Sequence, residues 1–69
     1  MMLTNLRPGD HGRIMAIEAG QGARNWLALR GISEGCALRM ISCRGPIVIE
    51  VNRNTIALSR GIAQKVRVV

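Results

Sequence analysis

Apolar and polar residues alternate along several short stretches of the chain, which is the period-2 pattern of half-buried β-strands. In the clearest stretch, IVIEV, the residues Ile47, Ile49 and Val51 lie on one face and the others on the opposite face. Apolar stretches elsewhere have a similar length and composition. The chain is therefore predicted to contain about five short strands: Arg13–Glu18, Cys36–Cys43, Ile47–Val51, Thr55–Ser59 and Lys65–Val69.

One segment, at about residues 22–30, has helical rather than strand periodicity. On a helix Ala23, Trp26 and Leu27 share one face, which is expected to cover the sheet, with Leu29 beside Trp26. Arg30 falls in the same arc, and its place in the last turn allows its side chain to swing outward and bond to helix-end carbonyls. The sequence thus predicts one short helix inserted after the first strand.

Glycines separate the predicted elements. Gly31 stands where a short helix needs a left-handed residue at its C-terminal end, and Ile32 is expected to fold back onto the last turn. The four glycines assigned to turns or to the helix cap are Gly9, Gly31, Gly35 and Gly45. Residues 52–54 (NRN) are predicted to form a tight connection because Asn tolerates left-handed geometry. Residues 60–64 are predicted to make a single helical turn.

Short strands, tight turns and one helix favour a mainly β fold in which a small barrel of about five strands removes exposed sheet edges. With 69 residues, the whole chain (residues 1–69) is predicted to be a single domain. Trp26 is the only aromatic residue, so the core must consist of aliphatic side chains. Truncation of Leu27, Ile49 or Ile56 is expected to cost about 2–5 kcal/mol each.

The net charge of +6 would attract nucleic acid, anionic lipid or an acidic protein face. The ten cations are spread almost evenly along the chain, however, which is the pattern of ordinary solvent-facing positions. No stretch approaches the ~20 apolar residues that cross a membrane. The N-terminal residues lack the layout of a signal peptide, so a cytoplasmic location is expected.

No arrangement of residues predicts catalysis, a cofactor or a metal site. GQGARN lacks the context of a phosphate-binding loop, and His11, the only histidine, has no nucleophile near it in the sequence. The candidate metal ligands lack ligand-pair spacing: Asp10, His11, Glu18, Glu34, Cys36, Cys43 and Glu50. If the two cysteines share one extended strand, they lie roughly 23 Å apart, too far for a disulfide.

Several short motifs, in order and spacing along nearly the whole chain, resemble the FeoA family. They are Leu6-x-Pro8-Gly9, Gly31-Ile32-x-x-Gly35, Gly45-Pro46-Ile47-x-Ile49-Glu50, Ile56-Ala57-Leu58 and Ala63. The resemblance implies an SH3-like β-barrel and a small cytosolic partner of FeoB, the membrane GTPase that moves ferrous iron into bacteria. Related domains in DtxR-type, metal-dependent repressors imply a second role, in regulation.

The leading prediction is a non-enzymatic accessory protein of ferrous iron uptake that meets the membrane only through FeoB. The candidate partner-binding residues are Arg24, Trp26 and Arg30, which could form one surface, and Arg44, which with Gly20–Gly22 forms a second candidate patch. A tryptophan on a short helix over a barrel is usually a lid over the core, and for Trp26 the role of partner anchor is the alternative to that.

Two other functions stay open. A small basic barrel could bind nucleic acid, although the chain has no Phe or Tyr to stack on bases. A stand-alone regulatory or protein-interaction domain is the other alternative, with an extended peptide as its ligand class. Self-association through an edge strand is compatible with every one of these functions.

Overall fold

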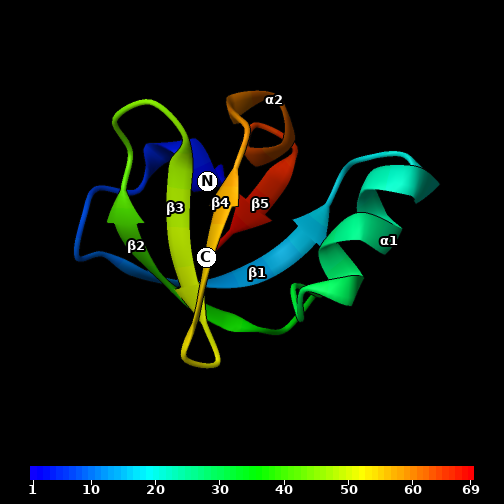
Figure 1. Ribbon diagram of the computed structural model, residues 1–69, viewed down its shortest axis with the longest axis horizontal. Coiled ribbons are helices and arrows are strands. Elements are labelled where there is room, and N and C mark those ends of the chain that lie inside the picture. The colour runs from blue at the N-terminus through cyan, green and yellow to red at the C-terminus, as the bar shows by residue number, and fades with distance from the viewer.

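The computed structural model describes all residues from Met1 to Val69 and contains one antiparallel five-stranded sheet with the strand order β4-β3-β2-β1-β5 (Figure 1). The strands curve round a shared interior, and α1 lies at one side of them. The elements are η1 (Leu3–Asn5), β1 (His11–Ile17), α1 (Gln21–Leu29), β2 (Ala37–Ser42), β3 (Ile47–Val51), β4 (Asn54–Leu58), α2 (Arg60–Ala63) and β5 (Val66–Val68).

The predicted fold class is confirmed: a mainly β, SH3-like fold with one short helix after the first strand. The helix occupies residues 21–29 rather than 22–30, and β3 has the predicted bounds. The prediction of a strand from Cys36 to Cys43 was too long, because both cysteines flank β2 rather than belong to it. The one-turn 3₁₀ helix η1 was not predicted, since three residues carry no periodic signal.

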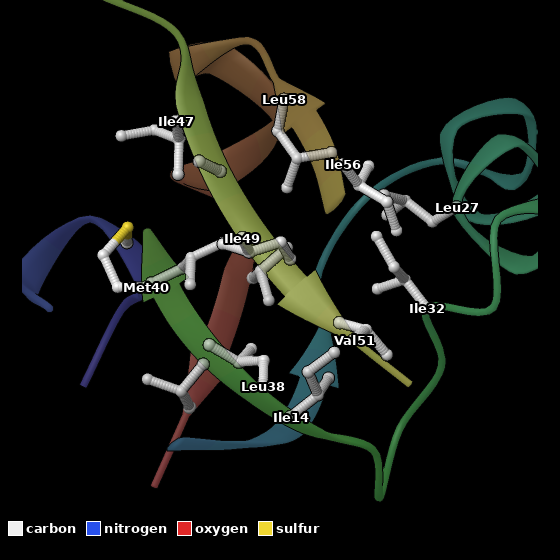
Figure 2. Packing of buried hydrophobic residues seen from close by; sticks show 14 of the residues in the cluster. Ile14, Leu27, Ile32, Leu38, Met40, Ile47, Ile49, Val51, Ile56 and Leu58 are labelled. Carbon is white, nitrogen blue, oxygen red and sulfur yellow. The ribbon is translucent and has the colours of Figure 1, made fainter. Parts of the chain in front are cut away.

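The core consists of 16 buried side chains, all hydrophobic, in one cluster. Inward-facing residues of β2, β3 and β4 form its centre, including Met40, Ile49 and Leu58 (Figure 2). Leu27 of α1 and Ile32 approach the cluster beside Ile56, from the side of β4 (Figure 2). The helix is therefore joined to the barrel through a small apolar contact rather than through a broad face.

The C-terminal end of α1 forms the Schellman arrangement that satisfies helix-end carbonyls. The Gly31 N–H donates to the Ala28 carbonyl and the Ile32 N–H to the Leu27 carbonyl, each at 3.0 Å. Gly31 has a φ of +81°, the left-handed conformation that glycine adopts without steric cost. Ile32 is consequently folded back and buried, at 1% exposure, as the sequence predicts.

The hairpin between β3 and β4 has a two-residue connection. Val51 pairs with Asn54, and the two residues between them, Asn52 (φ +52°) and Arg53 (φ +68°), are both left-handed. This is the geometry of a type I′ turn, whose twist matches that of the flanking strands. The predicted tight turn is confirmed, but the left-handed pair includes an arginine, and Asn54 is the first residue of β4.

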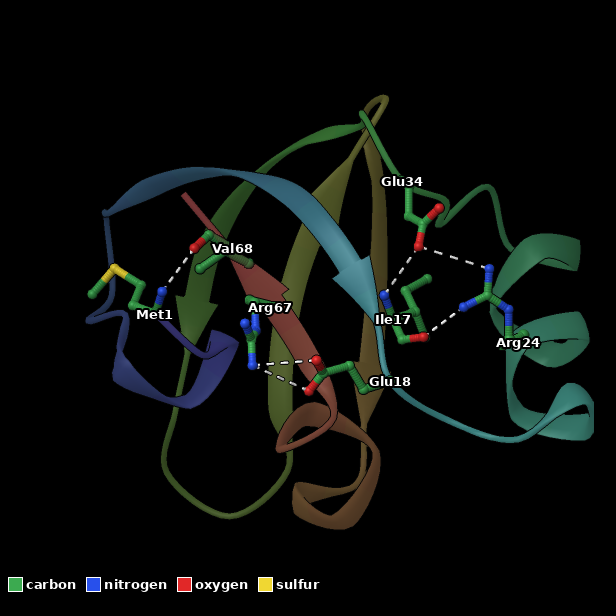
Figure 3. Close-up of polar contacts among 7 residues, drawn as sticks. All are labelled: Met1, Ile17, Glu18, Arg24, Glu34, Arg67 and Val68. Carbon is green, nitrogen blue, oxygen red and sulfur yellow. Dashed lines mark hydrogen bonds and ion pairs between the residues drawn. The ribbon is translucent and has the colours of Figure 1, made fainter.

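The first residues of the chain cover the outer edge of β5. The Met1 amino group donates to the Val68 carbonyl at 3.1 Å, and the Val68 N–H donates to the Met1 carbonyl at 2.7 Å (Figure 3). A bridge between Met2 and Arg67 extends this pairing. No helix of the structure is long and apolar enough to cross a membrane.

Candidate functional site

Helix α1 presents two different flanks beside its buried residue, Leu27. One flank, carrying Gln21, Arg24 and Ala28, lines a shallow groove together with Ile17 and Glu34. Residues two apart on an α-helix differ by about 200° in direction. Trp26 therefore lies on the flank opposite to Arg24, so the surface predicted to combine them is divided between two sides of the helix.

Arg24 ties α1 to the end of β1. Its Nη1 donates to the Ile17 carbonyl at 2.5 Å, and its Nη2 lies 3.8 Å from Glu34 Oε2 (Figure 3). The same carboxylate accepts the Ile17 N–H at 3.4 Å. The Arg24 guanidinium is thus engaged within the chain, in positioning the helix.

Trp26 and Arg30 form a stacked pair on the other flank. The Arg30 guanidinium lies 3.7 Å from the centroid of the indole, within cation–π range, and Arg30 Nη1 donates to the Trp26 carbonyl at 3.0 Å. The predicted bond from Arg30 to a helix-end carbonyl is confirmed. Trp26 is half-buried, because part of its ring packs against the core cluster while the rest remains accessible.

Leu29 lies next to this pair and is 85% exposed, the most exposed large hydrophobic side chain in the structure. From the sequence, Leu29 was expected beside Trp26 on the face that covers the sheet, and that inward assignment was wrong. On the helix its direction lies about 60° beyond that of Trp26, away from the core. Trp26, Leu29 and Arg30 together are called the Trp26 surface below.

Arg44 lies in the turn between β2 and β3, on the opposite side of the molecule from α1 (Figure 1). It is exposed and makes no side-chain hydrogen bond within the chain. The neighbouring Cys43 carbonyl accepts a bond from Arg60 Nη2, which connects this turn to α2. The predicted patch of Arg44 with the Gly20–Gly22 loop is therefore not one continuous surface.

A second shallow groove lies beside the β3–β4 hairpin, on the outer face of the sheet. A row of polar residues crosses three neighbouring strands there, because His11 pairs with Arg39 and Arg39 pairs with Glu50. Arg39 Nε and Nη2 both lie 3.2 Å from Glu50 Oε1. Arg53 borders the same groove. No residue of this groove was singled out as a partner-binding candidate from the sequence.

The candidate metal ligands remain dispersed. No three His, Cys, Asp or Glu side chains come close enough together to hold a metal ion. Asp10 accepts the Arg7 N–H at 2.9 Å, within the turn that precedes β1. Each of the three glutamates, Glu18, Glu34 and Glu50, lies within 4 Å of one arginine, as the ion pairs Arg67–Glu18, Arg24–Glu34 and Arg39–Glu50 show.

Cys36 has the more distinctive thiol of the two free cysteines. Its Sγ lies 3.3 Å from the Ser33 hydroxyl, and bonds from the Ser33 side chain and backbone lower the pKa of Cys36 below its usual 9.0. The positive charge of Arg13 lowers that pKa further, while partial burial opposes the shift. At a given pH, a larger fraction of Cys36 is therefore in the thiolate form than is the case for an ordinary cysteine.

The model of the FeoA domain family matches the chain over residues 1–69. The chain belongs to the FeoA family. A relative from Methanocaldococcus jannaschii, named "Putative Fe(2+) transport protein A", is 35% identical over 63 residues, which are 90% of this chain and 77% of that protein. The family model therefore matches the whole chain, and the relative matches nearly all of it.

Solved structures agree with this assignment. A crystal structure titled as an iron uptake regulatory protein, FeoA, superposes with a TM-score of 0.87 at 31% identity, over 100% of this chain and 96% of that one. A manganese-dependent transcriptional repressor superposes with a TM-score of 0.92 at 30% identity, over 100% of this chain but only 40% of the repressor. The same domain thus occurs as one part of a larger regulator.

Proposed function

We propose that this FeoA-family chain is a non-catalytic accessory protein of ferrous iron uptake, which binds the cytosolic part of a FeoB-type membrane GTPase. Support comes from the family and from the relative named for Fe(2+) transport. The chain has no phosphate-binding loop, so any GTP hydrolysis belongs to the partner. Contact with that partner takes place in the cytoplasm, and the chain meets the membrane only indirectly.

The observation that carries this proposal is the Trp26 surface. Trp and Arg are the residue types most enriched in interface hot spots, and exposed leucine adds apolar area beside them. The stacking of Arg30 on the indole at 3.7 Å holds both side chains in place before binding. A surface ordered in advance loses less conformational entropy when a partner arrives. We therefore assign the Trp26 surface as the main contact with the GTPase.

Binding of the GTPase to the Trp26 surface would affect the transport cycle by changing the populations of the conformations of the GTPase. A protein that binds two conformations of its partner with different affinity favours the one it binds more tightly, and equal affinity shifts nothing. The accessory role therefore requires that one state of the GTPase presents a better surface for Trp26 and Leu29 than another.

The test uses two aspartate substitutions on exposed positions of α1. Leu29→Asp introduces a charge into the Trp26 surface, while Ala28→Asp introduces the same charge next to it in sequence but on the opposite flank. Affinity for the purified cytosolic domain of FeoB from the same host is measured by biolayer interferometry. We expect Leu29→Asp to weaken binding by about 10-fold or more and Ala28→Asp to change it little.

Circular dichroism of both variants controls for folding, because neither substituted side chain is part of the buried core. Equal loss of affinity in the two variants would remove the Trp26 surface from the proposal. The absence of any binding by the wild-type chain would argue against the accessory role itself.

A regulatory role is the second candidate, favoured by the 30% identity to the manganese-dependent repressor. In that case the chain would bind another regulatory protein instead of the GTPase. Affinity capture from the host under iron limitation distinguishes the two roles by the partner recovered. Recovery of nucleic acid that is released by modest salt would instead favour binding through phosphates alone.

A further inference from the structure

Arg53 occupies a backbone conformation that its residue type seldom adopts. Its φ is +68°, in the second position of the two-residue turn between β3 and β4. Type I′ turns prefer Asn followed by Gly, because both positions need a positive φ. Asn52 follows this preference and Arg53 does not. Strained residues of this kind cluster at functional sites, so the backbone conformation of Arg53 indicates a functional role for its side chain.

The strained turn places Arg53 at the groove beside the hairpin. The apolar side chain that this groove exposes is that of Ala37, because Leu38 is buried in the core, while His11, Arg39 and Glu50 come from three neighbouring strands. The Glu50 carboxylate is held by Arg39 at 3.2 Å. The His11 and Arg53 side chains make no hydrogen bond or ion pair within the chain. Both are therefore available to a ligand.

We propose that this groove binds an acidic segment of a partner protein, with the Arg53 guanidinium donating to one of its carboxylates. Arginine presents a planar pair of donors that matches a carboxylate, and such charge-assisted bonds are the strong ones. The inference rests on the proposed function only in taking the cytosolic part of FeoB as the source of the segment.

A protein segment fits this groove better than a polyphosphate does. The Glu50 carboxylate lies within the groove and repels a continuous run of phosphates, whereas a segment with a single acidic side chain can keep its charge toward Arg53. Binding of single-stranded nucleic acid relies on aromatic side chains that stack on bases, and the groove contains none. Asn52 adds an amide that can bond to the backbone of a bound segment.

The test separates the strain from the binding role with one substitution. Arg53→Gly relieves the positive φ and removes the guanidinium, so it should raise the Tm by about 4 °C or more while it weakens binding. Arg44→Gln removes an exposed, unpaired arginine at the other side of the molecule as a control of equal charge. The probe is a fluorescein-labelled peptide with one glutamate flanked by glycine and serine residues, called the one-glutamate peptide below, and its binding is measured by fluorescence anisotropy at 150 mM salt.

We expect Arg53→Gly to weaken binding of the one-glutamate peptide about 10-fold and Arg44→Gln to weaken it less than about 2-fold. In ¹H–¹⁵N spectra of the wild-type chain, the peptide should shift the amide signals of residues 11, 39 and 50–54 but not those of α1. Equal effects of the two variants on affinity would overturn the proposal, and so would shifts confined to α1.

Two further probes identify the ligand class. An oligothymidylate or a vesicle containing phosphatidylglycerol that binds the same groove more tightly than the one-glutamate peptide would also overturn the proposal. Because these assays contain no GTPase, they are independent of the test with Leu29→Asp. Failure of the groove and failure of the accessory role are therefore distinguishable.

Discussion

The end of α1 supplies the sharpest test of how this sequence determines its structure. Gly31→Ala adds one methyl group at a φ of +81°, and the new Cβ would meet no atom within 4 Å. Crowding contributes nothing, so the cost is that of holding a non-glycine residue in the left-handed region, about 1–2 kcal/mol. A chain of this length has a total stability on the order of 3–10 kcal/mol. The substitution should therefore remove a large fraction of it.

Gly22→Ala is the matched control. Gly22 lies within α1, its φ is not positive, and a Cβ there also meets nothing within 4 Å. In a helix alanine is favoured over glycine by up to about 1 kcal/mol, with a smaller gain in the first turn. The same chemical change should therefore destabilise the protein at position 31 and stabilise it at position 22.

Urea denaturation followed by circular dichroism measures both effects, as shifts of the midpoint with an unchanged slope. For a domain of this size, 1 kcal/mol corresponds to about 4–8 °C in Tm, so thermal scans give a second reading. If Gly31→Ala were neutral, or if both variants shifted in the same direction, the left-handed conformation would not be what ends this helix.

Three more outcomes are expected. Ile49→Ala should cost about 2–5 kcal/mol in a urea titration, because Ile49 is fully buried at the centre of the sheet; an unchanged midpoint would contradict its place in the core. Near pH 7.5 iodoacetamide should alkylate Cys36 faster in the wild-type chain than in the Ser33→Ala variant, because the lowered pKa of the wild-type thiol leaves more thiolate at that pH. Equal alkylation rates would show that the bond from Ser33 has no effect on the pKa of Cys36. Trp26 should fluoresce between the wavelengths of buried and fully hydrated indole, and Arg30→Ala should shift its emission to the red; an unchanged spectrum would argue against the stacked pair.

Much of the fold could be predicted because each local pattern agrees with the tertiary structure. The alternation in residues 47–51 specifies which side chains enter the core, and Ile47, Ile49 and Val51 are all buried. Gly31 ends the helix as predicted, so local and global preferences point to the same structure. What the patterns could not supply was η1, which contains the buried Leu3 and packs against α2 and β5, two elements near the other end of the chain.

The candidate surface on α1 was predicted only in part. Trp26 and Arg30 are four residues apart and meet, whereas Arg24 is two residues from Trp26 and lies on the other flank. Helical geometry alone could have separated Arg24 from the pair. The same geometry places Leu29 about 200° from the buried Leu27, so its exposure could also have been predicted.

Arg53 shows where local sequence rules and function diverge. Residues 52–54 predicted a tight turn on the strength of the two asparagines, yet the left-handed pair is Asn52 and Arg53. Glycine at position 53 would suit the turn better, so the local rule gives no reason for an arginine there. Positions that break a local rule in an otherwise consistent sequence are expected at functional sites. Arg53 borders a groove and its guanidinium is unpaired, so the bond proposed between it and a carboxylate would be such a reason for an arginine in a strained turn.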